Sequence, residues 1–355
     1  MFRQDRTNPS TAVSNWKGRH DTPKGHPSTA VSKWLNGGLF GDPFIYVMGS
    51  PAAYYCGGYG DAMRLDKINR INFSDDAVGL IATTLSSARS VVNGGFANSG
   101  TAGYSSGGYD GSTSQVVDKI LFSNEARTSL ASGLSTAVRQ NPNGGYANSG
   151  TAGYVAGGYV ASTVIDKWAF SDDSRTTLST GLAIDRYDTA AFANSGTAGY
   201  VAGGYGTAVG SNQGIQQSVE KFAMPGDARS MLSATLTMNG NFGNTGLLGL
   251  SNSGTAGYTG GGYATNSIDR IEKWTYSGDI HSVLSATLNH YQRDGCGAAD
   301  VGTAGYFIGG DTWWPSTTLD TTDKLTFSGE TVAALAGTLS SPSSRGNAFA
   351  NTDGL

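Results

Sequence analysis

Ala-Asn-Ser-Gly-Thr-Ala-Gly-Tyr occupies residues 97–104 and returns unchanged at 147–154 and 193–200. It recurs with one change at 251–258, in a shorter form at 303–306 and in a degenerate first copy at 52–59. A double glycine lies within or just after each copy, and successive double glycines are 50, 50, 46, 58 and 48 residues apart. A tyrosine follows the first five of them and Asp311 follows the sixth. Such a period is typical of a fold that uses one supersecondary unit repeatedly.

Two further pieces follow the glycine-rich strand in each unit. The first has an acidic or amide residue, a basic residue and then apolar alternation, which predicts a strand; its copies begin at Asn69-Arg70, Asp118-Lys119, Asp166-Lys167, Glu220-Lys221, Glu272-Lys273 and Asp323-Lys324. The second carries two aliphatic residues four apart, as in Ile81/Leu85 and Leu335/Leu339. The Ser, Thr and Gly residues between them are poor helix formers, so this piece is also expected to be a strand.

An arginine and a strand of small residues complete the unit. The arginines are Arg89, Arg139, Arg186, Arg293 and Arg345. Asn-Ser-Gly then joins the small-residue strand to the next glycine-rich strand as a tight hairpin, because Asn and Gly tolerate a left-handed backbone. Sixfold repetition of the Asp/Glu-Lys pair argues against an acid–base dyad. It predicts a ring of ion pairs or hydrogen bonds between units, and the arginine is expected to brace the connection in which it lies.

The composition agrees with an all-β protein. Glycine contributes 53 of 355 residues, charged residues 14% and hydrophobic residues 38%, with 17 tyrosines. These values exclude a coiled coil and argue against a solvated disordered chain. The net charge of −4 divides into +3 for residues 1–43 and −7 for the remainder. An acidic body lacks the basic surface expected of a nucleic-acid-binding protein.

The arginine, the small-residue strand, the double glycine and the aromatic strand, repeated about every 50 residues, resemble the kelch repeat. The resemblance covers about residues 51–355 and implies that each unit is one β-propeller blade. Six units then predict a six-bladed kelch-like β-propeller over residues 44–355. Residues 346–351 match the sequence of the small-residue strand better than residues 44–49 do. We therefore expect 346–351 to pair with residues 54–59 of the first blade and to close the ring.

Residues 1–43 form a separate, extended arm with a tandem motif of its own. Pro-Ser-Thr-Ala-Val-Ser-Asn-Trp at 9–16 and Pro-Ser-Thr-Ala-Val-Ser-Lys-Trp at 27–34 lie 18 residues apart. A flexible leader is one interpretation, because such a polar stretch buries too little surface to fold alone. The favoured interpretation is a docking arm that presents Val13, Trp16, Val31 and Trp34 to equivalent pockets of a partner, because large aromatic residues anchor interfaces.

Catalytic, metal-binding and cofactor-binding residues are not expected in this chain. His290, Asp294 and Cys296 are close in sequence, but their spacing matches no zinc pattern, and the glycine-rich turns lack the Gly-Lys-Ser/Thr ending of a phosphate loop. Cys56 and Cys296 are interpreted either as two free thiols or as a disulfide across the closed ring. No apolar run is long enough to span a membrane, and residues 1–5 have no hydrophobic signal region, so a standard secretion signal is not expected.

Function is expected where the units differ. The connections that leave one face of a propeller are mostly short here, but residues 206–217, 239–250 and 311–320 are longer. The last of these contains Asp311, Trp313 and Trp314 in place of the usual tyrosine. An exposed tryptophan beside a carboxylate is typical of a sugar-stacking site, so these residues are candidates for contact with a host-surface glycan or receptor. The alternative is a tryptophan that merely fills a gap beneath the loop.

The wording of the repeat and its turns also resembles kelch-type structural proteins of tailed bacteriophages, notably those of cyanobacteria. This resemblance implies a non-enzymatic virion protein that is made in the host cytoplasm and released without a secretion signal. Residues 1–43 would dock to other virion proteins of the capsid, tail or baseplate, in several copies of a symmetric assembly, with the propeller outward. The alternative function is a carbohydrate- or receptor-binding module that acts through the long-loop face.

Overall fold

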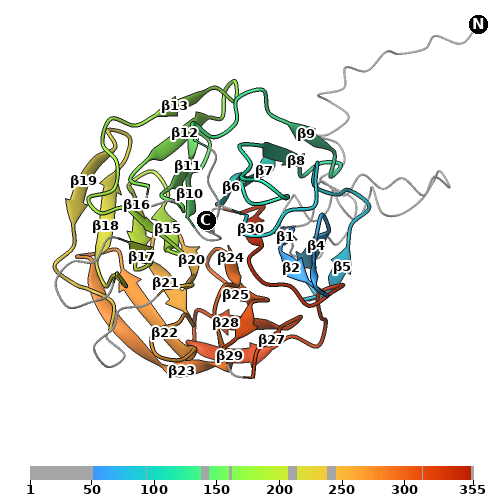
Figure 1. The fold of residues 1–355 in the computed structure, drawn as a ribbon. Coiled ribbons are helices and arrows are strands. Elements are labelled where there is room, and N and C mark those ends of the chain that lie inside the picture. The colour runs from blue at the N-terminus through green and yellow to red at the C-terminus, as the bar shows by residue number, and fades with distance from the viewer. Residues whose placement is uncertain are drawn as a thin grey trace, which may run out of the picture. The chain divides into compact units, whose positions relative to one another are not determined.

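The computed structural model describes residues 51–92, 94–136, 144–159, 162–206, 214–237, 245–313 and 315–352. These ranges form six four-stranded antiparallel sheets arranged as blades around a central axis (Figure 1). The prediction of an all-β, six-bladed β-propeller is therefore confirmed. The expected arm at 1–43, with Val13, Trp16, Val31 and Trp34, lies outside the described residues, as do residues 44–49.

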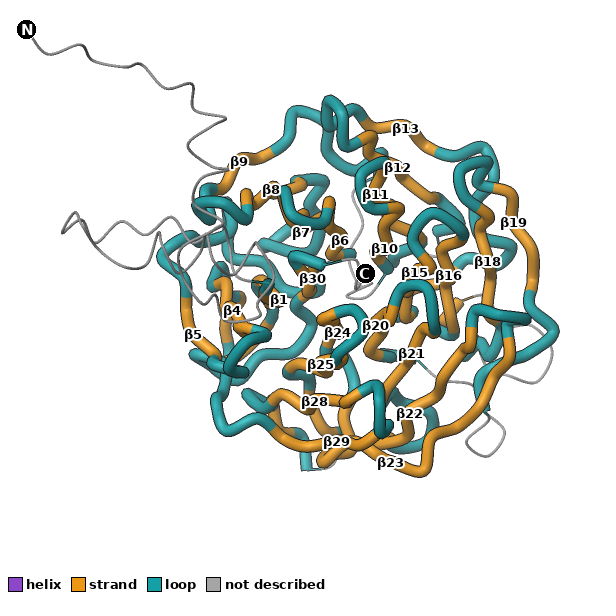
Figure 2. The backbone as a smooth tube through the Cα atoms, turned by 180° about the vertical axis from the view of Figure 1, so that it is seen from behind, coloured by secondary structure: helices purple, strands orange, loops and turns teal. Residues whose placement is uncertain are grey.

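Each blade places its strands in the same order from the axis to the rim, as Figure 2 shows. The innermost strands, from blade one to blade six, are β30 (Asn347–Ala350), β6 (Gly95–Asn98), β10 (Gly145–Asn148), β15 (Ala190–Asn194), β20 (Leu248–Asn252) and β24 (Cys296–Asp300). The glycine-rich second strands are β1 (Ala52–Cys56), β7 (Ala102–Ser106), β11 (Ala152–Ala156), β16 (Ala198–Ala202), β21 (Ala256–Gly260) and β25 (Ala304–Ile308).

The third strand and the rim strand form the outer half of each blade. The third strands are β4 (Ile68–Asn72), β8 (Val117–Leu121), β12 (Ile165–Ala169), β18 (Val219–Ala223), β22 (Ile268–Thr275) and β28 (Thr322–Thr326). The rim strands are β5 (Val78–Leu80), β9 (Arg127–Ser129), β13 (Arg175–Thr177), β19 (Ala228–Met231), β23 (Ile280–Gln292) and β29 (Thr331–Ala334). Short two-stranded ladders extend three blades: β2 (Tyr59–Gly60) with β3 (Met63–Arg64), β14 (Arg186–Tyr187) with β17 (Tyr205–Gly206), and β26 (Asp311–Thr312) with β27 (Thr317–Thr318).

The ring is closed by strand β30, which belongs to blade one. Its residues pair antiparallel with β1, from Asn347 opposite Cys56 to Ala350 opposite Ala53. Figure 1 shows this red strand beside the blue strands of the first blade. The pairing agrees with the closure expected from the repeated wording of residues 346–351.

Adjacent blades interlock through one glycine of the repeated octet. On the inner strand of blade two, Phe96 lies opposite Tyr104 of the second strand. The Phe96 ring packs against Gly153 of blade three. A Cβ atom added to Gly153 would lie 1.9 Å from that ring. The same relation joins Phe349 to Gly103, Tyr146 to Gly199, Phe192 to Gly257 and Leu250 to Gly305. Glycine is therefore required in the second strand by close packing between blades.

The rim strands lie earlier in the chain than the sequence predicts. In five blades the strand ends before the aliphatic pair: β5, for instance, ends at Leu80, and Ile81 and Leu85 follow it. The backbone N–H groups of Ile81 and Leu85 donate to Ile68 and Asp66, so the segment crosses the blade without a continuous ladder. Leu85 is buried because it covers the core between two blades. Among the six rim strands, only β23 includes its two aliphatic residues, Leu284 and Leu288. Its pairing with β22 contains two shifts of register.

The repeated basic residues of the third strands form the predicted ring between blades. Each donates to an acidic residue in the turn that precedes the next blade's rim strand: Arg70 to Glu125, Lys119 to Asp173, Lys167 to Asp227, Lys221 to Asp279, Lys273 to Glu330 and Lys324 to Asp76. All six acidic residues have a left-handed backbone, with φ between 49° and 57°. This conformation is unusual for residues other than glycine, so the turn aims each carboxylate at the neighbouring blade.

The asparagine and the arginine of the repeat also brace the blades. Asn98 Oδ1 accepts the backbone N–H of Gly150 in the next blade at 3.0 Å, while Gly100, not Asn98, supplies the left-handed residue of its hairpin, with φ +72°. Arg89 is fully buried and donates to the carbonyl oxygens of Gly107 and Val116 and to the carboxylate of Asp118. Arg186 makes the equivalent contacts in blade four. Arg139 lies outside the described residues.

Candidate functional site

The connections between strands on one side of the propeller form a face with a regular pattern of backbone pairs. In five blades the residue after the double glycine forms an antiparallel bridge with a residue just before the inner strand. These bridges are Tyr59–Ser344, Tyr109–Ser90, Tyr205–Tyr187, Tyr263–Thr245 and Asp311–Arg293. We call this side of the ring the connection face. The described ends of the three long connections noted in the sequence belong to it, and residues 207–213, 238–244 and 314 lie outside the described ranges.

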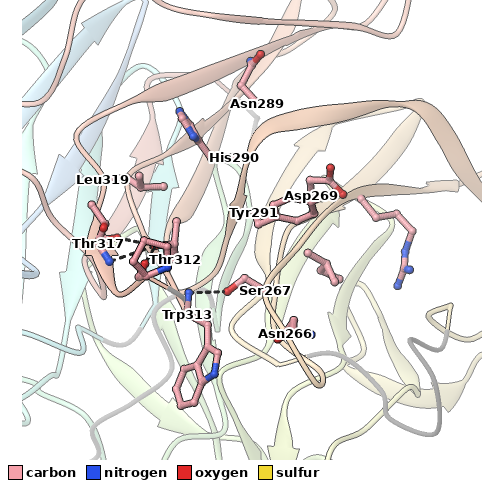
Figure 3. A pocket seen from close by; sticks show the side chains of 13 residues that line it. Asn266, Ser267, Asp269, Asn289, His290, Tyr291, Thr312, Trp313, Thr317 and Leu319 are labelled. Carbon is pink, nitrogen blue, oxygen red and sulfur yellow. Dashed lines mark hydrogen bonds between the residues drawn. The ribbon is translucent and has the colours of Figure 1, made fainter.

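A groove of about 890 Å³ opens on the connection face between blades five and six. Residues 266 and 267 of the connection after the double glycine of blade five, together with residues 268–270 at the start of β22, form one part of its lining. The rest of the lining comes from residues 289–291 at the end of β23 and, in blade six, from Thr312, Trp313, Pro315, Thr317 and Leu319 (Figure 3). Figure 3 shows Trp313 at one end of the lining and Asn289 at the other. A groove of this volume can hold a small ligand or a segment of a polymer.

Trp313 lines the groove and is 47% exposed. Its backbone N–H donates to Ser267 Oγ at 3.0 Å, which ties the blade-six ladder to blade five. The indole also packs at a tilt against Tyr263, with 4.9 Å between ring centroids. The guanidinium of Arg293 lies 4.5 Å from the indole centroid and 5.1 Å from the Tyr263 centroid. The tryptophan is thus held by cation–π and aromatic contacts while much of its surface faces solvent.

Asp311 contacts Arg293, the residue that lies against Trp313. Its carboxylate accepts Arg293 Nε at 2.9 Å, and its side chain is 13% exposed. Burial and the neighbouring Asp294 carboxylate raise the pKa of Asp311, whereas Arg293 lowers it. Asp311 therefore orients Arg293, which in turn contacts Trp313, and Asp269 is the carboxylate that lines the groove itself. Trp314, the third candidate, lies outside the described residues.

The wall formed by β23 was not expected from the sequence. Two register shifts against β22 let this strand run to Gln292 and bring Asn289, His290 and Tyr291 to the groove. Tyr291 is strongly exposed. The sequence gives no distinct signal for this wall. Four residues separate Leu288 from Arg293, but four also separate Leu134 from Arg139, and five separate Leu339 from Arg345. The spacing therefore does not show which unit has a register shift in its rim strand.

Next to the bridges of the connection face, successive backbone hydrogen bonds link each of several blades to the next. Gly246 donates to Asp188, Asp294 to Gly246, Arg345 to Asp294 and Val92 to Arg345, at 2.6–3.1 Å. The corresponding stretch of blade three lies within residues 137–143, outside the described ranges. Arg345 Nε also donates to the Asp294 carboxylate at 3.1 Å. Burial raises the pKa of Asp188 well above its usual range, and the nearby Asp294 carboxylate raises it further.

The two cysteines are buried free thiols, so the structure supports the first of the two interpretations drawn from the sequence. Burial raises the pKa of Cys296 well above its usual value, which makes the thiolate unfavourable. Among the described residues, no group of three or more His, Cys, Asp or Glu side chains is arranged to hold a metal ion. Those residues also include no helix that is both long and apolar enough to cross a membrane.

Comparison with known proteins adds no family to this fold. No protein-family model matches the chain, and no curated protein is significantly similar to it. The fold itself and the geometry of the connection face are therefore the basis for any functional conclusion.

Proposed function

We propose that this protein is a non-enzymatic structural component of a tailed-phage particle whose propeller binds carbohydrate in the groove between blades five and six. The observation that carries the carbohydrate part is Trp313, an indole that is held on one side by Arg293 and Tyr263 and exposed along the groove. An aromatic platform flanked by hydrogen-bonding side chains is the usual chemistry of sugar recognition. Asn266, Asp269 and Asn289 supply such side chains here.

The kelch relationship and the setting in a phage particle rest on the repeat itself. The buried arginine that binds the carbonyl oxygen of the first glycine, as Arg89 does with Gly107, gives a structural reason for the conserved spacing of the repeat within this chain. The six interlocked blades make a rigid module that suits display on a particle surface. Docking is assigned to residues 1–43, with Trp16 and Trp34 as anchors, because the motif that contains them is duplicated.

The groove assignment is tested by a single substitution. The parent protein is applied to an array of bacterial surface glycans, and Trp313→Ala is applied to the same array. We expect the parent to bind and the variant to lose most of the signal, because it loses the stacking platform. Met231→Ala removes a comparably exposed apolar side chain from the rim strand β19 and should bind like the parent. A parent protein that binds no glycan would refute the carbohydrate assignment.

The docking assignment is tested by a deletion. Removal of residues 1–43 should leave the melting temperature of the propeller unchanged and abolish incorporation into particles when the truncated gene replaces the intact one. A substitution of both Trp16 and Trp34 by alanine should reproduce the defect. Normal incorporation of the truncated protein would exclude the arm as the anchor and leave the groove assignment unaffected.

A further inference from the structure

The molecule contains two sets of repeated tyrosines with opposite environments. The first set lies on the second strands and is buried; these residues are Tyr54, Tyr104, Tyr154, Tyr200, Tyr258 and Tyr306. Four of them donate their hydroxyl groups to the turn carboxylates of the neighbouring blade. The second set follows the double glycines on the connection face and consists of Tyr59, Tyr109, Tyr159, Tyr205 and Tyr263. The first set is structural because it joins blades, and the second set needs a separate explanation.

The fold does not require tyrosine at the second set of positions. Each bridge is formed by backbone groups, and blade six forms the same bridge with Asp311 in place of tyrosine. Tyr59 is 43% exposed and Tyr205 is 39% exposed, whereas Tyr109, Tyr159 and Tyr263 are half-buried. None of these five described rings belongs to the buried core, so core packing does not explain why tyrosine recurs at this position. Exposed aromatic residues that recur at equivalent sites are characteristic of a binding surface.

Aromatic or cation–π contacts hold four of these five rings: Tyr109, Tyr159, Tyr205 and Tyr263. The Arg64 guanidinium lies 4.7 Å from the Tyr109 centroid. The Tyr187 ring lies between Tyr159 and Tyr205, at centroid distances of 5.2 and 5.4 Å. Tyr263 contacts Arg293 and Trp313, so the set of tyrosines is continuous with the groove. A ring that is already held loses little conformational entropy when a ligand stacks on it.

Carboxylates lie near two of these rings in addition to the guanidinium groups of Arg64 and Arg293. Asp61 and Asp110 are exposed and close in sequence to Tyr59 and Tyr109. Alternation of aromatic rings with hydroxyl-binding carboxylates fits a chain of sugars. Phosphate groups of a nucleic acid would be repelled by these carboxylates. The core of a protein–protein interface would be depleted of such charges.

We propose that the tyrosines after the double glycines extend the groove into a surface with several equivalent sugar-stacking positions, so that the ligand is a polysaccharide long enough to contact more than one blade. This inference rests on the proposed function. The groove supplies one binding position and the tyrosines supply weaker ones. Joint occupation of linked positions by one polymer then raises the affinity beyond that of a short fragment.

The test measures how the binding affinity depends on the length of the polysaccharide and on the presence of these tyrosines. Bacterial capsular and O-antigen polysaccharides are screened for binding, and the polysaccharide that binds is partially hydrolysed into a size series. Affinity of the parent protein should rise with fragment length. In Tyr59→Ser/Tyr205→Ser the affinity for the longest fragments should fall about tenfold, since each stack contributes modestly, while the affinity for the shortest fragments stays the same. Leu80→Ser, an exposed apolar residue on the rim, is the matched control.

The outcomes separate this inference from the proposed function. Thermal melting first establishes that the variants are folded, which we expect because blade six forms the same bridge with Asp311 in place of tyrosine. Binding that depends on Trp313 but is independent of fragment length and of both tyrosines would overturn the inference and leave the groove assignment intact. Absence of binding to every polysaccharide and every array glycan would overturn both.

Discussion

At the scale of single residues, three positions of the repeated octet make contacts between blades. Asn98 binds the backbone of the next hairpin, Gly153 makes room for Phe96, and Tyr104 donates to Asp173 in the neighbouring turn. The exception supports the rule. In the first blade the glycine is replaced by Ala53, and the side chain that would enter it from blade six is the small Ala298. Two positions far apart in the sequence therefore vary together because they share one packed volume.

The pair formed by Phe96 and Gly153 provides a stability prediction. Gly153→Ala should lower the free energy of unfolding by about 1–3 kcal/mol, because the new methyl group overlaps the Phe96 ring. Phe96→Ala alone should cost about 3–5 kcal/mol. The double variant reproduces the natural Ala298/Ala53 pair, so its cost should be clearly smaller than the sum of the two single costs. Urea unfolding measures all three values, and strictly additive costs would contradict the interlocking role.

Glu220 allows a buried and a peripheral ion pair to be compared on one carboxylate. Arg186 and Glu220 are both fully buried, whereas Arg229 lies 3.8 Å from the same carboxylate and is a third exposed. Arg186→Met leaves Glu220 without its buried partner and should cost about 3–5 kcal/mol. Arg229→Met should cost less than about 1 kcal/mol. Chemical denaturation of both variants decides the matter, and similar losses would show that burial does not set the strength of the pair.

The roles of these repeated residues could be predicted only in part from the sequence. Repetition of a basic residue at this position in all six units, preceded by Asp or Glu in five of them, indicated ion pairs between units, because a catalytic group is rarely copied six times. The same reasoning could not predict the behaviour of Arg293. Its counterpart Arg89 is buried against Asp118, but Arg293 turns toward Asp311 and Trp313. That difference depends on neighbours in space, which the spacing of the repeat does not contain.

At the scale of strands, the propeller departs from regularity at two places. Strand β23 extends past the other rim strands and forms a wall of the groove. Strand β30 crosses from the end of the repeat array to the first blade. The closure could be anticipated because residues 346–351 repeat a known wording. The wall could not, because a register shift follows from the packing of two neighbouring strands, and the spacing of this unit is shared by another unit of the repeat.

Deletion of residues 346–355 should abolish the cooperative unfolding transition. The deletion exposes the inner edge of β1 and removes Phe349, which is buried between Tyr54 and Phe122. Calorimetry checks this expectation, with a protein that lacks residues 1–43 as the control for shortening the chain. Addition of a peptide with the sequence of residues 345–352 should restore part of the transition by strand pairing. Unchanged melting of the truncated protein would refute the role of β30 in closure.

At the scale of the whole molecule, ion pairs and buried tyrosines form parallel rings around the axis. Burial raises the pKa of Tyr154 to about 12, and burial together with Glu330 raises the pKa of Tyr258 to about 12. Both values lie above the ordinary tyrosine pKa of about 10 in an unfolded chain. The stability that these groups contribute is therefore complete below pH 10 and is lost as the pH rises from 10 toward 12.

The free energy of unfolding should accordingly fall steeply above pH 10. Tyr258→Phe removes one of the titrating groups, so its stability should decline less steeply than that of the parent over the same range. Phe349→Leu has no ionisable group and should lower the stability by the same amount at every pH. Urea unfolding between pH 8 and 11.5 measures these slopes. Parallel curves for the parent and Tyr258→Phe would contradict the proposed linkage.

The pairing of β30 with β1 also has a consequence for folding during synthesis. On the ribosome, β1 emerges near the start of the propeller, and its partner emerges only after all six double glycines have been synthesised. At translation rates of 5–20 residues per second, the inner edge of the first blade waits on the order of 15–60 s without its partner. An unpaired edge of that kind invites association with other nascent chains. The final strand thus sets the moment at which the growing chain stops being prone to aggregation.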